Sequence, residues 1–307
     1  MFMRRGIKLA HLRLLAVLVQ TGQVGAAASA LGLTQPAASR LLAEAERIAG
    51  TALHQRTGRG VALTPAGEAL ARRAQQVLID LDDAGREVAE IAEGRFGQVR
   101  VGAVTGPALD HVLPAVERAR DALPGVSVEV VVATSDVLCE GVAAGRLDFA
   151  LARLPGDAGA TGFAYAEVAP EPVVIAARRG HPLADGRRVA PADLMAFDWV
   201  MPAPEAVLAR TVRARLRAMG LPDPPGRVAT ASFLFTLALL ADSDAVAPLA
   251  RAVAMRFAGG GGAGIAVLPA DLGIEVAPWG LVTRAGAGLT PSAARLRDMI
   301  LPAEPVA

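Results

Sequence analysis

The sequence predicts an α/β protein with an N-terminal winged-helix head, and three observations support this fold class. Residues 7–64 read as three short helices followed by two strands around a glycine-containing turn. A single helical pattern then continues for about 30 residues without a break. From residue 98 onward, strand-like and helix-like segments alternate, which indicates an α/β domain with a mostly parallel sheet. A chain of 307 residues is long enough for all three parts.

The composition argues against several other classes of protein. No apolar run reaches the roughly 18 uninterrupted residues that a membrane span needs. The basic and apolar N-terminus resembles a signal peptide, but Lys8, His11 and Arg13 interrupt it and no small-residue cleavage site follows. The single Cys139 forms neither an internal disulfide nor a metal pair. We therefore expect a cytoplasmic protein without a metal or bound cofactor.

The charge is distributed unevenly along the chain. Residues 1–64 carry eight Lys or Arg side chains and two Glu, a net charge of +6. The other 243 residues carry 23 basic and 28 acidic side chains, a net charge of −5. A basic head on a mildly acidic body indicates a polyanion-binding module joined to a domain with another role.

Three helices are predicted in the head. The first covers residues 7–20, with leucines at helical spacing, and ends at Gly22. The second starts at Val24 with small apolar residues at i, i+3, i+4 and i+7, and ends at Gly32. The third follows Thr34, which is a suitable N-cap, and has Pro36 in its first turn, where the missing N–H has no cost.

A helical wheel gives this third helix two different faces. The apolar face carries Ala37, Ala38, Leu41, Leu42, Ala45, Ile48 and Ala49. The outer face carries Gln35, Pro36, Ser39, Arg40, Ala43, Glu46 and Arg47. An outer face that is small, polar and basic near the helix N-terminus suits the major groove of DNA, where Gln and Arg pair with base edges. The alternative is the solvated face of an ordinary three-helix bundle.

A basic hairpin and a long helix complete the head. Strands are predicted at residues 52–55 and 61–63, and Arg56 and Arg59 project from the hairpin, as in a wing that contacts phosphates or the minor groove. The long helix begins at Pro65 and ends near residue 94. Its apolar residues recur at steps of four and three: Leu70, Ala74, Val77, Leu81, Ala84 and Val88. Such a seam predicts a dimerisation linker, the alternative being that the helix packs on its own domain.

The rest of the chain reads as two α/β lobes. Strands are predicted at 99–104, 126–133 and 147–154, with a helix over 108–122, and a similar alternation continues to residue 285. Clusters of Pro and Gly at 154–162 and 259–264 mark expected crossings between the lobes. On the α/β lobes alone, a solute-binding protein or a small-molecule enzyme would be possible.

The head resembles the LysR-type transcriptional regulators. The resemblance rests on the run "ALGLTQPAASRLLAEAERIAGTALHQRTGRGVALTPAGE", with its Q-P-A-x-S-R helix start, the arginine after the first wing strand and the closing L-T-x-A-G. The segments "EPVVIAARRGHPLA" and "WGLVTRAG" look like the paired crossover strands of the family. Two positions depart from the pattern: His54 replaces the usual phenylalanine, and Gln23 replaces a common serine. These changes affect the packing of the wing and one phosphate contact.

The resemblance implies a regulator rather than an enzyme. It divides the chain into a winged helix-turn-helix domain at 1–64, a linker helix at 65–94 and an effector-binding domain at 95–307. The last would be a two-lobed, type II periplasmic-binding-protein-like domain, with lobe I at about 95–160 plus the C-terminal segment and lobe II at about 161–268. Expected partners are double-stranded promoter DNA, RNA polymerase and further copies of the chain in a dimer of dimers. The DNA-binding residues would be Thr34, Gln35, Pro36, Ser39, Arg40, Arg56 and Arg59.

The resemblance also implies a small-molecule co-inducer. Effector pockets in the family are lined by loops at strand ends and helix N-termini, which suit small polar or anionic metabolites. The corresponding residues are Thr105, Thr134, Ser135, Pro202, Ser232 and Phe233. Each hydroxyl is equally explained as a helix N-cap, whereas their shared placement favours a ligand. The strands also look similar to the branch of the family that regulates sugar and aromatic-acid catabolism.

Overall fold

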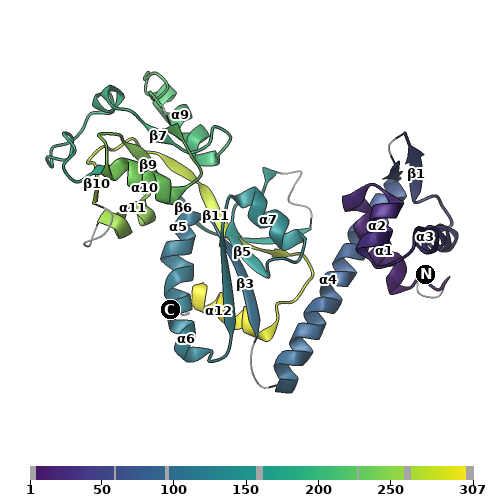
Figure 1. Cartoon of the computed structure of the whole chain (residues 1–307). Coiled ribbons are helices and arrows are strands. Elements are labelled where there is room, and N and C mark those ends of the chain that lie inside the picture. Colours follow the sequence, from purple (N-terminus) through teal and green to yellow (C-terminus); the bar gives the residue numbers. More distant parts are fainter. Residues whose placement is uncertain are drawn as a thin grey trace. The chain divides into compact units, whose positions relative to one another are not determined.

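The computed structural model describes residues 5–58, 60–93, 97–156, 162–226, 228–258 and 264–301. The chain forms two compact units, Met1–Gly94 and Arg95–Ala307 (Figure 1). Arg59, one of the two predicted wing arginines, lies outside the described residues. Within them, no helix is both long enough and apolar enough to cross a membrane.

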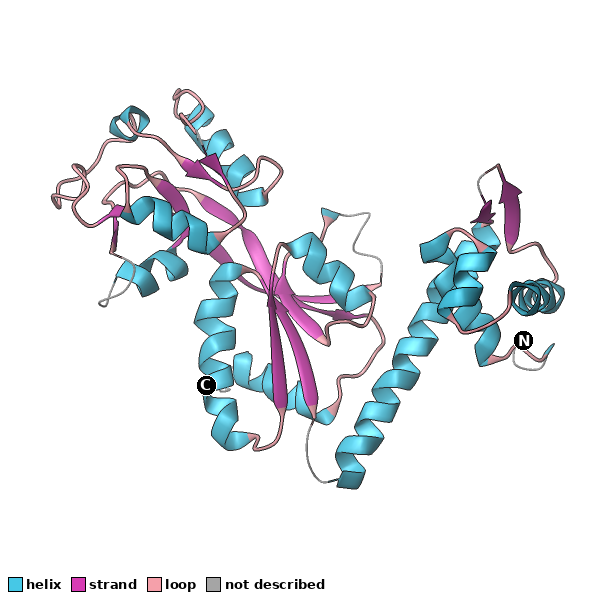
Figure 2. Cartoon of the chain, viewed as in Figure 1, coloured by secondary structure: helices cyan, strands magenta, loops and turns pink. Residues whose placement is uncertain are grey.

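The first unit contains the predicted helices and hairpin. Its elements are α1 (Leu9–Thr21), α2 (Val24–Ala30), α3 (Gln35–Ala49), β1 (His54–Thr57), β2 (Gly60–Leu63) and α4 (Pro65–Glu93). The two strands pair antiparallel (Figure 2). β1 begins two residues later than predicted, because the N–H groups of Leu53 and His54 donate to the carboxylate of Glu46 instead of extending the strand.

A small apolar core holds the first unit together. It is formed by Leu14, Leu15, Leu18, Ala27, Ala28, Ala38, Leu42, Ala45, Leu53 and Ala71. The buried residues of α3 all come from its predicted apolar face, so the helical-wheel assignment of that face is confirmed. α4 packs on α1, and Leu70 and Ala71 of its first turns belong to this core. The first part of α4 therefore packs on its own domain, which was the alternative to a dimerisation linker.

The second unit is built on one seven-stranded sheet. Its strands are β3 (Gln98–Ala103), β4 (Ser127–Val132), β5 (Phe149–Ala152), β6 (Phe163–Arg178), β9 (Ala247–Ala250), β10 (Ile265–Val267) and β11 (Glu275–Arg284). They lie in the order β10-β6-β11-β5-β3-β4, with β9 also paired to β6. Figure 1 shows β6 and β11 running from one half of this unit into the other.

The prediction of a mostly parallel sheet was wrong. Among the described strands of the large sheet, the parallel pairings are those of β3 with β4 and with β5. The other four pairings of the large sheet are antiparallel. The physical reason is that β6 leaves the first half and β11 returns to it, so these two long strands run in opposite directions and impose that direction on their neighbours.

Each half of the second unit has its own core. In the first half, α6 (Leu113–Ala122) and α12 (Pro291–Ile300) cover β3 and β5 on one face, while α7 (Ser135–Ala143) packs against the sheet as part of a separate cluster. The helix predicted at 108–122 starts earlier, as α5 (Thr105–Pro107), and continues as a π-helical turn over Ala108–Val112. Pro114 has no N–H to donate, which removes one α-helical hydrogen bond from this region.

In the second half, Trp199 is fully buried within one of two apolar clusters. Its elements are the 3₁₀ turn η3 (Asp193–Ala196), β7 (Val200–Met201), α9 (Val207–Ala218), β8 (Val228–Ala229), α10 (Phe233–Ala241) and α11 (Arg251–Ala258). β7 has only two residues, and they pair parallel with β8.

Candidate DNA-binding face and effector site

The N-terminal turn of α3 presents a polar face to solvent. The hydroxyl oxygen of Thr34 accepts a hydrogen bond from the N–H of Ala37 at 3.4 Å, and Pro36 occupies the first turn. Gln35, Ser39 and Arg40 are all exposed, as is Pro36. The residue types that read base edges therefore lie on the outside of a capped helix start, as the sequence predicts.

The L-T-x-A-G motif joins the wing to α4. The Thr64 hydroxyl donates to the carbonyl of Ala52 at 2.8 Å and accepts from the N–H of Gly67 at 3.1 Å. Gly67 lies directly against the backbone of Leu53, and a Cβ at this position would overlap the Leu53 carbonyl oxygen. Only glycine fits here, so the motif fixes the first turn of α4 against the base of the wing.

His54 takes part in a hydrogen-bonded cluster around the Glu46 carboxylate. One carboxylate oxygen of Glu46 accepts from the N–H of Leu53 at 2.9 Å and from the N–H of His54 at 3.3 Å, and it lies 2.8 Å from His54 Nδ1. Burial by itself would raise the pKa of Glu46, but these hydrogen bonds outweigh it, and the pKa lies below its ordinary value of 4.5. The assignment of Glu46 to the outward face of α3 was wrong, because its side chain turns to the wing.

The other departure, Gln23, lies where α2 meets the wing. Gln23 is the N-cap residue of α2, but its side chain makes no capping hydrogen bond. Its Cγ would lie 3.2 Å from a Cβ on Gly60, and the N–H of Val61 donates to the Gly22 carbonyl at 3.0 Å. The turn end of the hairpin, at the start of β2, is therefore tied to the end of α1. Arg56 is exposed on β1.

A buried histidine links α1 to α3. His11 is fully buried, and its Nδ1 accepts from the N–H of Lys8 at 2.9 Å. Nε2 therefore carries the proton, and it faces the Glu44 carboxylate at 3.3 Å. The hydrogen bond from His11, together with the charge of Lys8, holds the pKa of Glu44 below its ordinary value.

The predicted apolar stripe of α4 divides into two parts. Leu70 is half-buried and Ala74 is 1% exposed, and both lie where α4 packs on its own unit. From Val77 onward the stripe faces solvent, with Val77 42%, Leu81 51% and Val88 65% exposed, and Ala84 exposed as well. The part of the stripe that is available to a second helix therefore begins at Val77, because the residues before it are already used in the monomer.

The three effector residues predicted in the first half follow β3 and β4. Thr105 is half-buried at the start of α5. Thr134 is the N-cap residue of α7, and its hydroxyl hydrogen-bonds to Asp136 and thereby lowers the pKa of that carboxyl. The Ser135 hydroxyl oxygen accepts from the N–H of Arg153 at 3.1 Å. Because β3, β4 and β5 run parallel, these residues and Arg153 gather at the carboxyl ends of three neighbouring strands.

The three residues predicted in the second half lie at the carboxyl ends of β7 and β8. Pro202 follows β7, and the N–H of Thr230, just after β8, donates to the carbonyl of Met201. The Ser232 hydroxyl caps α10 by accepting from the N–H of Phe235 at 3.2 Å. The ring of Phe233 lies 5.2 Å from that of Phe257 on α11. Among the described residues, no hydrogen bond joins these three to the three of the first half.

Sequence reasoning missed two charged residues beside Ser135. Arg153 follows β5, and its guanidinium pairs with the Glu171 carboxylate on β6 at 2.6 Å and donates to the Ala277 carbonyl at 2.6 Å. The two side chains are only 12% and 15% exposed. A polar residue directly after a buried strand was the signal for Arg153, whereas Glu171 is positioned only by the pairing of β6 with β11.

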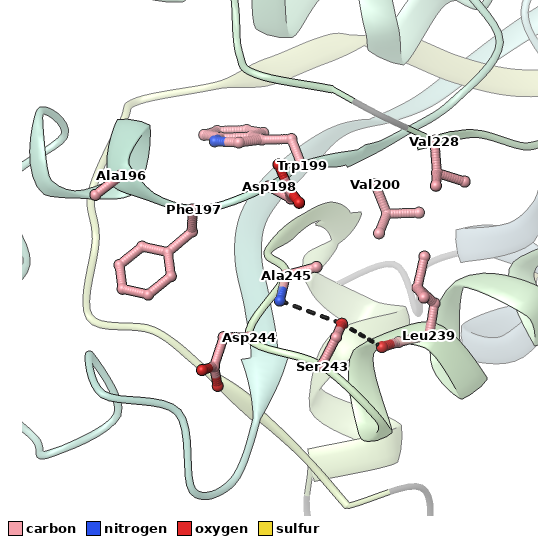
Figure 3. A pocket seen from close by; sticks show the side chains of 10 residues that line it. All are labelled: Ala196, Phe197, Asp198, Trp199, Val200, Val228, Leu239, Ser243, Asp244 and Ala245. Atoms are coloured by element: carbon pink, nitrogen blue, oxygen red, sulfur yellow. Dashed lines mark hydrogen bonds between the residues drawn. The ribbon is translucent and has the colours of Figure 1, made fainter.

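A separate pocket of about 530 Å³ opens in the second half (Figure 3). Phe197 and Trp199 line it together with Ser243 and Asp244. The Ser243 hydroxyl donates to the Leu239 carbonyl and accepts from the N–H of Ala245, as the dashed lines show. None of the predicted effector residues lines this pocket, so it does not support their assignment.

Comparison with known families matches both units. Residues 9–68 match the bacterial regulatory helix-turn-helix protein, lysR family, and residues 92–304 match the LysR substrate binding domain. The chain belongs to the LysR family of transcriptional regulators. A regulator of this family is a DNA-binding protein with an effector-binding domain and is not an enzyme. The alternative of a solute-binding protein or a small-molecule enzyme is thereby excluded.

Two relatives and one solved structure illustrate the match. The chain is 42% identical over 253 residues to the HTH-type transcriptional regulator GbpR of Rhizobium radiobacter, covering 82% of this chain and 84% of that protein. It is 35% identical over 293 residues to GbpR of Azospirillum brasilense, covering 95% of this chain and 85% of that protein. Full-length CbnR, solved in complex with its target DNA, has a similar fold, with a TM-score of 0.59 at 22% identity. The match covers 96% of this chain and 99% of the CbnR chain.

Proposed function

We propose that this LysR-type regulator reads double-stranded promoter DNA with the first turns of α3. Gln35, Ser39 and Arg40 would contact base edges in the major groove, with Thr34 and Pro36 shaping the helix start. Arg56 and Arg59 would contact the phosphate backbone. The observation that carries this proposal is the exposed polar face of α3, capped by Thr34 at its N-terminus. The winged helix-turn-helix domain would span 1–64, the linker 65–94 and the effector-binding domain 95–307.

A gel-shift competition tests the base-reading role. An operator selected from random DNA is compared with a scrambled duplex for Gln35→Ala and Arg40→Ala. Each variant is expected to lose about 1–3 kcal/mol of discrimination, because a base contact is lost. Arg47→Ala is the control, since Arg47 is exposed two turns further along the same helix. Unchanged discrimination in both test variants would contradict the proposal.

The same proposal includes an oligomer paired through α4. The exposed stripe from Val77 to Val88 would pack against the same stripe of a second copy, and two such dimers would form the dimer of dimers. Apolar side chains that are about half or more exposed on one face of a single helix favour this arrangement. A dimer would place two copies of α3 on two half-sites of the operator.

A small molecule would control the activity of the protein. It would bind near Thr105, Thr134 and Ser135 in the first half and Pro202, Ser232 and Phe233 in the second, and would favour one arrangement of the oligomer. Regulation would take place in the cytoplasm through contact with RNA polymerase at the promoter. Two assays test this. A reporter assay is run with a metabolite that has been found by thermal-shift screening, and a gel shift is run without the metabolite. Thr105→Ala or Ser135→Ala should keep DNA binding and reduce the response; a full response would contradict this ligand site.

A further inference from the structure

A nearly buried ion pair occupies the loops where an effector is proposed to bind. We call Gly106, Ser135, Arg153 and Glu171 the Glu171 cluster. Arg153 and Glu171 pair at 2.6 Å, and the N–H of Arg153 donates to the Ser135 hydroxyl at 3.1 Å. The cluster therefore joins the loops after β3, β4 and β5 to the long strand β6.

Gly106 admits the carboxylate of Glu171 to this position. A Cβ at Gly106 would overlap Oε1 of Glu171 and would lie 3.5 Å from the Ala250 methyl group of the second half. Gly106 has no left-handed φ, so the space that it leaves, rather than its backbone freedom, explains the glycine. The chain thus places its own negative charge beside Thr105, at a site where an anionic ligand was expected.

We propose that the effector is a neutral, hydroxyl-rich molecule of the sugar type and that Glu171 determines this specificity. The inference rests on the proposed effector site. Arg153 is the guanidinium that would attract a ligand carboxylate, and it is already paired with Glu171. A second carboxylate beside Glu171 would be repelled, and the mostly buried position leaves little water to screen the repulsion.

The cluster has hydrogen-bonding capacity left for adjacent hydroxyl groups. Each oxygen of Glu171 has two acceptor sites, and Arg153 has five donor hydrogens, of which Nε and one Nη2 hydrogen are used in hydrogen bonds. The Ser135 hydroxyl accepts from Arg153 and still has its own proton to donate. A vicinal diol can donate from one hydroxyl to Glu171 and accept at the next from Arg153, which is a complementarity that a carboxylate lacks.

Matched pairs of ligands test the proposal on the unmodified protein. The probes are D-galactose with D-galacturonate and D-glucose with D-glucuronate, plus benzoate as an aromatic acid, measured by thermal shift and calorimetry. At least one neutral sugar is expected to bind, at least tenfold more tightly than its acid. The proposal is overturned if no neutral sugar binds, if a sugar acid binds as tightly as its neutral partner, or if benzoate binds as tightly as the best neutral sugar.

A charge-neutral variant tests the role of Glu171. Glu171→Gln keeps the size of the side chain and one acceptor oxygen. The ratio of the affinity for a neutral sugar to the affinity for its acid should fall at least tenfold in this variant. Glu275→Gln is the control: Glu275 is exposed on β11 and pairs with Pro172, so its side chain lies on the opposite face of the strand pair from Glu171. An unchanged preference in Glu171→Gln would remove Glu171 from the site, and the wild-type comparison stands even if this variant does not fold.

The result can be separated from the proposed function. A gel shift without any sugar measures operator binding by α3 alone. If the operator is bound but acids are preferred as ligands, only the inference about the effector fails. If the operator is not bound, the proposed function fails whatever the ligand preference.

Discussion

Gly67 and Leu53 pack backbone against backbone, with no room for a side chain at position 67. Thr64 caps the same helix start and bonds to the same segment, so the base of the wing and the first turn of α4 form one rigid joint.

Gly67→Ala should destabilise the first unit strongly. The added methyl group overlaps a carbonyl oxygen, and overpacking of this kind costs about 1–3 kcal/mol or more. The control is Gly25→Ala in α2, where the new Cβ would meet only the Gln35 amide at 3.7 Å, an ordinary contact. That variant should be neutral or up to about 1 kcal/mol more stable. Urea unfolding followed by circular dichroism measures both, and equal effects would contradict the packing argument.

Glu46→Gln should lower the free energy of unfolding of the first unit by about 1.5–3 kcal/mol at pH 7, because hydrogen bonds to a charged acceptor are lost. The folded pKa of Glu46 is below 4.5, so its stabilisation is present above pH 4.5 and is lost as the pH falls through the folded pKa. The two proteins should therefore converge in acid. Hydrogen exchange of the Leu53 and His54 amides reports the effect, with exposed Glu87→Gln as the control. A constant difference at every pH would contradict the assignment.

Arg56→Ala should weaken binding to every DNA sequence alike. If Arg56 neutralises one phosphate, the slope of log K against log salt should become shallower by about one unit. Arg146→Ala removes the same charge from an exposed position in the second unit and should leave the slope unchanged. Fluorescence anisotropy across a salt series measures the slopes. Identical slopes for Arg56→Ala and wild type would place Arg56 outside the interface.

Leu81→Asp should break the dimer. Leu81 is 51% exposed in the middle of the free part of the α4 stripe, and a buried carboxylate there would have no partner. Arg72→Asp, about two and a half turns away on the opposite face, also adds negative charge and should keep the wild-type mass. Light scattering gives the mass of each variant. A dimer that survives Leu81→Asp would exclude this stripe as the interface.

Cys139 should be unreactive in the folded protein. Burial, and secondarily the charge of Asp136, raises the pKa of its thiol to about 11, so almost no thiolate exists near neutral pH. Labelling with a thiol reagent at pH 7.5 should be slow in the native protein and complete in urea. Cys139→Ala should bind operator DNA as the wild-type protein does. Rapid native labelling would show that the thiol is accessible and would contradict this expectation.

Local sequence was sufficient for the parts of this protein that depend on neighbours along the chain. The N-cap at Thr34 and the proline in the first turn of α3 follow from residues within four positions of each other, and the shared apolar face of Ala38 and Leu42 follows from their helical spacing. For the same reason, the length of α4 and the alternation of helices and strands were predictable. Short-range periodicity and capping depend only on the order of the residues along the chain.

The tertiary structure alone decided the features that join distant segments. The turn of Glu46 toward His54, the burial of Ala74 in its own unit and the antiparallel course of β6 and β11 depend on how finished elements pack. The pairing of Arg153 with Glu171 depends on a strand crossing between two halves. A periodic pattern states which face of an element is apolar, but the partner that covers it, or the charge that faces it, is set by the free energy of packing the whole chain.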